Sequence, residues 1–123
     1  ANYIYEDAAE YDQIKYARLN NSPNHLVLHE KLRLIEGGED ALVLSSGMAA
    51  ISTSLLALLS PGDHLLAQKT LYGATYAFLT KDLRRFGIEC DLVDPCQPSE
   101  WSQKRKPNTK MFYVESLSNP LLE

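Results

Sequence analysis

The chain is poor in cysteine and has no excess of cationic charge, and both shortages exclude classes of protein. Only two of its 123 residues are cysteine, at positions 90 and 96, too few for the disulfide framework of a small secreted domain. Both are expected to be free thiols in a reducing cytosol. The three histidines show no ligand spacing with these cysteines, so no metal site is predicted. The formal net charge of -4 leaves no cationic footprint for nucleic acid or an anionic membrane.

Long apolar runs and glycine-rich nucleotide motifs are also missing. The longest apolar stretch, residues 48–59, is interrupted by three hydroxyl side chains and is too short to span a bilayer. Residues 1–7 contain neither a basic region nor an apolar run, so no signal peptide is visible and a cytoplasmic protein is expected. Neither G-x-G-x-x-G nor a P-loop is present, which argues against a doubly wound nucleotide-binding domain.

What is present is an alternation of short apolar runs with helix-length periodic segments. Residues 1–24 are polar and are expected to form an extended arm that ends in a turn. Apolar periodicity predicts helices over residues 28–35, 48–59 and 76–86, with a short one near 100–101. Short apolar runs predict strands over residues 41–44, 64–67, 88–93 and 110–114. This order is typical of an α/β fold with a mostly parallel sheet.

The predicted sheet has too few helices to cover it. Four parallel strands with so little covering chain would leave sheet faces exposed, which parallel sheets rarely tolerate. More chain, or partner chains, is expected to complete the fold.

Ser45-Ser46-Gly47-Met48 joins a predicted strand to a predicted helix and is a candidate anion site. Free N–H groups and the positive end of the helix dipole attract phosphate there, and glycine lets it approach the backbone. The alternative is that the serines only cap the helix.

Three further residues could contribute to one site. Tyr72 and Asn119 each follow a predicted strand, and ligands of parallel sheets bind at the carboxyl ends of strands. An aromatic ring at position 72 could stack on a flat cofactor, and Arg18 on the arm suits phosphate. The alternatives are a half-buried core tyrosine, a turn-forming Asn-Pro and a solvated surface arginine.

Eight short motifs, in this order and spacing, resemble the Cys/Met-metabolism family of pyridoxal-phosphate (PLP) enzymes. The family includes cystathionine γ-synthase, cystathionine lyases, methionine γ-lyase and O-acetylhomoserine sulfhydrylase. The motifs are Tyr16-x-Arg18, Leu34-Ile35-Glu36-Gly37-Gly38, Ser45-Ser46-Gly47-Met48-Ala49-Ala50-Ile51, Pro61-Gly62-Asp63, Thr70-Leu71-Tyr72-Gly73-x-Thr75, Phe86-Gly87-Ile88, Val93-Asp94 and Glu115-Ser116-x-x-Asn119-Pro120.

The resemblance implies a fold and an organisation. Residues 25–123 would be the first part of an aspartate-aminotransferase-like PLP domain of fold type I. Residues 1–24 would be an arm that contacts a neighbouring subunit. The family is dimeric at least and commonly a dimer of dimers, so a homotetramer is expected.

The resemblance also implies roles for individual residues. Ser46, Gly47 and Met48 would hold the PLP phosphate, and Tyr72 would stack on the pyridine ring and could assist proton transfer. Asn119 would bond the cofactor's phenolic oxygen. Tyr16 and Arg18 would reach the phosphate held by a neighbouring subunit. The expected activity is elimination or replacement at the β- or γ-carbon of sulfur amino acids after α-proton removal.

Two departures from the family pattern limit the expectation. No motif matches the family's Schiff-base lysine or the aspartate at the pyridine nitrogen, so this chain is expected to be a fragment that is inactive by itself. Ala74 and Ala77 replace a cysteine and an arginine of some members, so the exact substrate is not readable. A γ-lyase or sulfhydrylase acting on a substrate of homocysteine or methionine type is favoured. The alternative is a non-catalytic remnant that serves as an interaction or dimerisation module.

Overall fold

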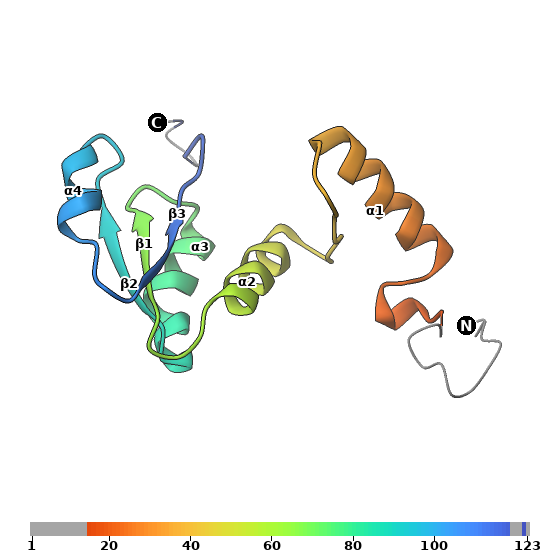
Figure 1. Cartoon of the computed structure of the whole chain (residues 1–123), viewed down its shortest axis with the longest axis horizontal. Helices are drawn as coiled ribbons and strands as arrows, with labels where there is room; N and C mark the ends of the chain where they lie inside the picture. The colour runs from red at the N-terminus through yellow and green to blue at the C-terminus, as the bar shows by residue number, and fades with distance from the viewer. Residues whose placement is uncertain (1–14, 119–121, 123) are drawn as a thin grey trace. The chain divides into compact units, whose positions relative to one another are not determined.

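The computed structural model describes residues 15–118 and 122. The chain divides into two compact units, Ala1–Ser45 and Ser46–Glu123, and each is described by itself (Figure 1).

The first unit contains a short 3-10 helix, η2 (Ala17–Leu19), and one α-helix, α1 (Pro23–Glu36). Helix α1 begins two residues inside the segment expected to be extended, because Ser22 has extended N-cap backbone and Pro23 occupies the first turn. It ends at Glu36, one residue beyond the predicted range, because the left-handed backbone of Gly37 (φ 66°) lets its N–H donate to the Arg33 carbonyl.

The prediction of a strand over residues 41–44 is wrong. These residues have no repetitive secondary structure, because a strand exists only through pairing and none of the described residues pairs with them. Their hydrogen bonds are made to side chains instead: Asn20 Nδ2 donates to the Val43 carbonyl at 2.7 Å, and the Ala41 N–H donates to Asp40 Oδ1 at 2.7 Å. The apolar run indicated burial but could not specify a partner strand.

The second unit is built on a three-stranded parallel sheet with the order β2-β1-β3. Its strands are β1 (His64–Gln68), β2 (Glu89–Val93) and β3 (Thr109–Tyr113). In register, Leu66 lies opposite Asp91 on one side and Phe112 on the other. Three of the four predicted strands and the parallel arrangement are therefore confirmed.

Three helical segments flank this sheet in the described part of the chain. They are α2 (Gly47–Leu58), α3 (Gly73–Ala77) and α4 (Pro98–Gln103), with α3 continuing as a π-helical turn, η3 (Phe78–Asp82), and a 3-10 turn, η4 (Leu83–Phe86). The helix predicted over residues 76–86 is present, but it begins three residues earlier and changes its hydrogen-bonding pattern twice. Figure 1 shows α3 and α4 on opposite sides of the sheet.

The core lies mainly between the sheet and the α2 and α3–η4 segments. Leu65 of β1 is fully buried, and it belongs to one cluster with Leu55 of α2 and Leu79 of η3. Each such leucine contributes about 1.5–3 kcal/mol when it is removed from water. On the other face, Trp101 of α4 meets Phe112 of β3 edge-on, with ring centroids 5.6 Å apart.

No helix among the described residues has both the length and the apolar character needed to cross a membrane.

Candidate functional site

The carboxyl ends of the three strands lie at one edge of the sheet, and contacts between the segments that follow them organise this edge. Tyr72 follows β1 and Glu115 follows β3, and the Tyr72 N–H donates to Glu115 Oε2 at 3.1 Å. Lys69, just after β1, forms an ion pair with Asp94, just after β2. The edge predicted to hold the site is thus a connected structure in the second unit.

The N-terminus of α2 presents free backbone donors. Ser46 caps the helix: its Oγ accepts from the Ala49 N–H at 3.0 Å, and its carbonyl accepts from the Ala50 N–H at 3.0 Å. The N–H groups of Gly47 and Met48 point out of the first turn, where a helix has no acceptor of its own. Neither donates to any residue that the structure describes. The helix cap considered for these serines exists at Ser46, and two donors remain for an anion.

Gly47 has no structural requirement for glycine. It lies in the helix without a positive φ, and a Cβ added to it would meet nothing within 4 Å. The space beside its backbone is therefore open to a ligand, as close approach of a phosphate requires. The residues of this turn fit the phosphate group of PLP.

Met48 is linked to the Tyr72 segment through Thr75. The Thr75 side chain is fully buried, and its Oγ1 donates to Met48 Sδ at 3.7 Å. Thr75 also forms a side-chain hydrogen bond with Tyr113 at the end of β3. Burial and the nearby Glu115 raise the pKa of Tyr113, and the hydrogen bond with Thr75 lowers it. The Thr75 hydroxyl therefore connects three segments: the α2 N-terminus, the first turn of α3 and the end of β3.

Tyr72 lies at the N-cap position of α3 and leaves its side chain 46% exposed. Its N–H is held by Glu115 and its carbonyl accepts from the Tyr76 N–H at 2.9 Å, so the backbone is fixed while the ring is accessible. An accessible ring on a fixed backbone is suited to stacking on a flat ligand.

Tyr16 and Arg18 pack on each other in the first unit. The Arg18 guanidinium carbon lies 4.5 Å from the centroid of the Tyr16 ring, a cation–π contact, and the Tyr16 N–H donates to Asn21 Oδ1 at 2.8 Å. Arg18 is exposed and makes no ion pair with the described part of the chain. Its charge is therefore available to an anion.

Asn119 lies outside the described residues. Its neighbour Ser118 is described and is almost completely buried, at 1% exposed.

Sequence reasoning assigned no role to Thr75 or Glu115. Both stand in motifs that carried the family resemblance, and those positions were the available signal. Periodicity could not have found them, since their partners are 27 and 43 residues away along the chain.

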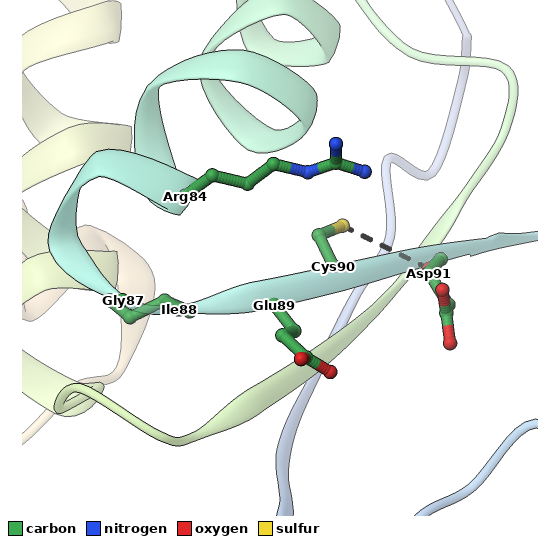
Figure 2. A pocket seen from close by; sticks show the side chains of 6 residues that line it. All are labelled: Arg84, Gly87, Ile88, Glu89, Cys90 and Asp91. Atoms are coloured by element: carbon green, nitrogen blue, oxygen red, sulfur yellow. Dashed lines mark hydrogen bonds between the residues drawn. The ribbon is translucent and has the colours of Figure 1, made fainter.

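A separate pocket of about 470 Å³ lies beside the first half of β2 and the preceding turn. Figure 2 shows Arg84 reaching along the same side of the strand as Cys90, while Glu89 and Asp91 project from the other side. Burial raises the pKa of the Cys90 thiol to about 11, so it is neutral and unreactive. None of the predicted site residues lines this pocket.

Comparison with solved structures defines the class of protein. The chain aligns over 99% of its length with a protein of Campylobacter jejuni assigned as an O-acetylhomoserine (thiol)-lyase, which carries a pyridoxyl-lysine monophosphate (TM-score 0.88, 32% identity, 32% of that chain). It aligns over its full length with cystathionine γ-lyase of Lactobacillus plantarum (TM-score 0.89, 28% identity, 32% of that chain). The fold is thus part of the large domain of fold type I PLP-dependent enzymes, as predicted.

The sequence comparisons specify the family. The chain matches the family described as Cys/Met metabolism PLP-dependent enzyme over residues 1–123, and it belongs to that family. It is 48% identical over 113 residues to L-methionine γ-lyase of Porphyromonas gingivalis and 44% identical over 118 residues to cystathionine β-lyase of Bacillus subtilis. These alignments cover 92% and 96% of the chain, which spans only 28% and 29% of the length of the two relatives. The resemblance stated from the motifs is confirmed.

Proposed function

We propose that the protein containing this chain is a PLP-dependent carbon–sulfur lyase or trans-sulfuration enzyme that acts on sulfur amino acids. The main observation is that the α2 N-terminus has two free N–H donors and open space beside Gly47. Thr75 links this turn to the segment of the accessible Tyr72. Family membership over the whole chain supports the same cofactor. When bound, PLP supplies an electron sink for negative charge at the substrate's α-carbon.

In this proposal the chain's own residues bind and orient the cofactor. The Gly47 and Met48 N–H groups bind the phosphate, and the Ser46 hydroxyl, which accepts from Ala49, has its hydrogen left to donate. The Tyr72 ring stacks on the pyridine, and its phenol can hold a proton near the reacting atoms. Asn119 donates to the phenolic oxygen.

We also propose a homo-oligomer with a shared site. Arg18 and Tyr16 reach the phosphate held by a second copy, which agrees with an exposed guanidinium that forms no ion pair with residues 15–118. Helix α1 has no buried residue, and its Leu34 and Ile35 are 63% and 76% exposed. Apolar exposure on this scale is typical of a surface that another chain covers. Residues 1–24 would then form the contacting arm and residues 25–123 the first part of the PLP domain.

The proposed compartment is the cytoplasm. Cys90 and Cys96 are both free thiols, and Cys96 is exposed. Free exposed thiols persist where the environment is reducing.

An activity assay on the native polypeptide that contains this sequence tests the proposal. It is loaded with PLP and incubated with methionine, homocysteine, cystathionine, or O-acetylhomoserine plus a thiol, and the released 2-oxo acid and thiol are measured. Turnover of at least one substrate that is lost without PLP is the expected result. PLP binding without turnover would instead favour the non-catalytic interaction module.

A further inference from the structure

Thr75 places a hydroxyl group at a buried position beside the apolar core. Its side chain is fully buried, and Leu79, one turn further along the same helical segment, belongs to the apolar core. Burying a hydroxyl costs free energy unless it is hydrogen-bonded, and the partners here are the Met48 sulfur, which is a weak acceptor, and the Tyr113 side chain. Valine has nearly the same shape and would pack there without that cost. Apolar packing alone therefore gives no reason for threonine at this position.

The contacts of Thr75 suggest what the hydroxyl does. Its Oγ1 donates to Met48 Sδ at 3.7 Å, one residue after Gly47 and within the turn that offers free N–H groups. Thr75 stands three residues after Tyr72, on the short helix that Tyr72 begins. This is the direct side-chain contact that connects the anion-binding turn of α2 to the tyrosine segment. It is reinforced from the other side, because Glu115 holds the Tyr72 N–H at 3.1 Å.

We propose that Thr75 is a positioning residue: its hydroxyl fixes the Ser46–Met48 turn relative to Tyr72, and so sets how tightly the phosphate end of PLP is held. The inference rests on the proposed function, since it assigns the phosphate to this turn. Thr75 itself touches neither the phosphate nor the ring. It acts through the orientation of the Met48 segment, so its removal weakens phosphate recognition in particular and leaves recognition of the ring largely intact.

Two variants of the native polypeptide test this role. Thr75→Val removes the hydroxyl and keeps the shape, and Thr75→Ser keeps the hydroxyl. For each, the dissociation constants of PLP and of pyridoxal, which lacks the phosphate, are measured, together with the thermal unfolding midpoint of the cofactor-free protein. Thr75→Val should raise the dissociation constant of PLP about three- to fivefold, toward the lower end of the effect of one neutral hydrogen bond, because the Met48 sulfur is a weak acceptor. Binding of pyridoxal should change less than about twofold, as expected if the lost hydrogen bond acts on the phosphate alone.

The remaining measurements separate positioning from a purely structural role. Thr75→Ser should restore PLP affinity to near the wild-type value. Thr75→Val should unfold within a few degrees of wild type, because Tyr113 is only partly buried and water can replace its lost partner. A valine variant that loses PLP and pyridoxal affinity equally, or that unfolds earlier while binding PLP normally, would overturn the inference. A wild-type protein that binds PLP no better than pyridoxal would overturn the proposed phosphate site itself, and this inference with it.

Discussion

Gly47 shows most clearly at the scale of one residue how the chain reserves space for a ligand. Glycine in the middle of a helix costs about 0.5–1 kcal/mol relative to alanine. The cost is smaller at the first helical residue, where Gly47 lies, but no close contact or positive φ there requires glycine. The surrounding structure would accept a side chain. The phosphate proposed to bind there would not, because a Cβ would fill the space beside the backbone donors.

Gly47→Ala should therefore separate stability from cofactor binding. We expect an unfolding temperature equal to or above that of wild type and a dissociation constant for PLP raised about tenfold or more, comparable to the loss of one or two charge-assisted hydrogen bonds. Isothermal titration and thermal unfolding measure the two quantities. Thr53→Ala, at an exposed position further along α2, is the matched control and should leave PLP affinity unchanged. Unchanged PLP affinity in Gly47→Ala would contradict the assignment of the phosphate to this turn.

At the scale of an element, the α3–η4 segment ends because Gly87 reverses the chain. Its backbone is left-handed (φ 73°), its carbonyl accepts from the Gly62 N–H at 2.7 Å, and a Cβ there would lie 3.2 Å from the Pro61 Cβ. The turn before β1 and the turn before β2 are thus packed against each other.

Gly87→Ala should destabilise the protein by about 1–2 kcal/mol from the left-handed backbone, with the crowding against Pro61 adding to it. Gly37 has a similar φ of 66°, and a Cβ added there would meet nothing within 4 Å. Gly37→Ala should therefore lose only the free energy that comes from the left-handed backbone. Denaturant unfolding of the two variants compares these effects. Equal losses would mean that the Pro61 contact carries no energy.

The amino ends of the three strands are joined by polar contacts around buried His64. Its Nδ1 lies 2.7 Å from Thr109 Oγ1 on β3, and its Nε2 lies 3.2 Å from Asp91 Oδ2 on β2. Lys106 Nζ donates to Asp91 Oδ2 at 2.9 Å, and this bond is the main reason that the pKa of Asp91 is lowered. The network fixes the strands at the edge opposite the candidate site.

The lowered pKa of Asp91 predicts a pH dependence of stability. Because the folded-state pKa lies below the unfolded value of about 3.9, the carboxylate stabilises the fold above about pH 4, and this contribution is lost as the pH falls through the folded pKa. Asp91→Asn should therefore cost up to about 1 kcal/mol at pH 7, since the group is partly exposed, and almost nothing at pH 2–3. Lys106→Met should show the same trend. A loss of equal size at both pH values would exclude the ion pair as its cause.

At the scale of the whole molecule, the sequence predicted those elements that depend mainly on neighbouring residues. Three strands, the helix stop at Gly87 and the cap at Ser46 follow from apolar runs and from the conformational preferences of glycine and serine. The strand at 41–44 was predicted incorrectly because strand formation depends on a distant partner, which an apolar run does not encode. Sequence alone also could not show that Thr75 meets Met48, since folding, not spacing, brings them together.

The candidate site was predictable to a similar degree. The motifs located Ser46, Gly47, Met48 and Tyr72, and the structure connects the α2 turn to the Tyr72 segment in one unit. Their roles toward PLP, and those of Tyr16, Arg18 and Asn119, remain predictions. These roles depend on contacts with a ligand and with a second chain, and the local sequence pattern of one chain does not specify such contacts.

Binding of PLP to the native polypeptide, followed by absorbance and circular dichroism in the cofactor's visible band with pyridoxal as the comparison, tests the central claim most directly. The account predicts an induced circular dichroism signal and markedly tighter binding of PLP than of pyridoxal, because the Gly47 and Met48 N–H groups recognise the phosphate. A protein that shows no induced circular dichroism with PLP, or that binds the two compounds equally, would contradict it.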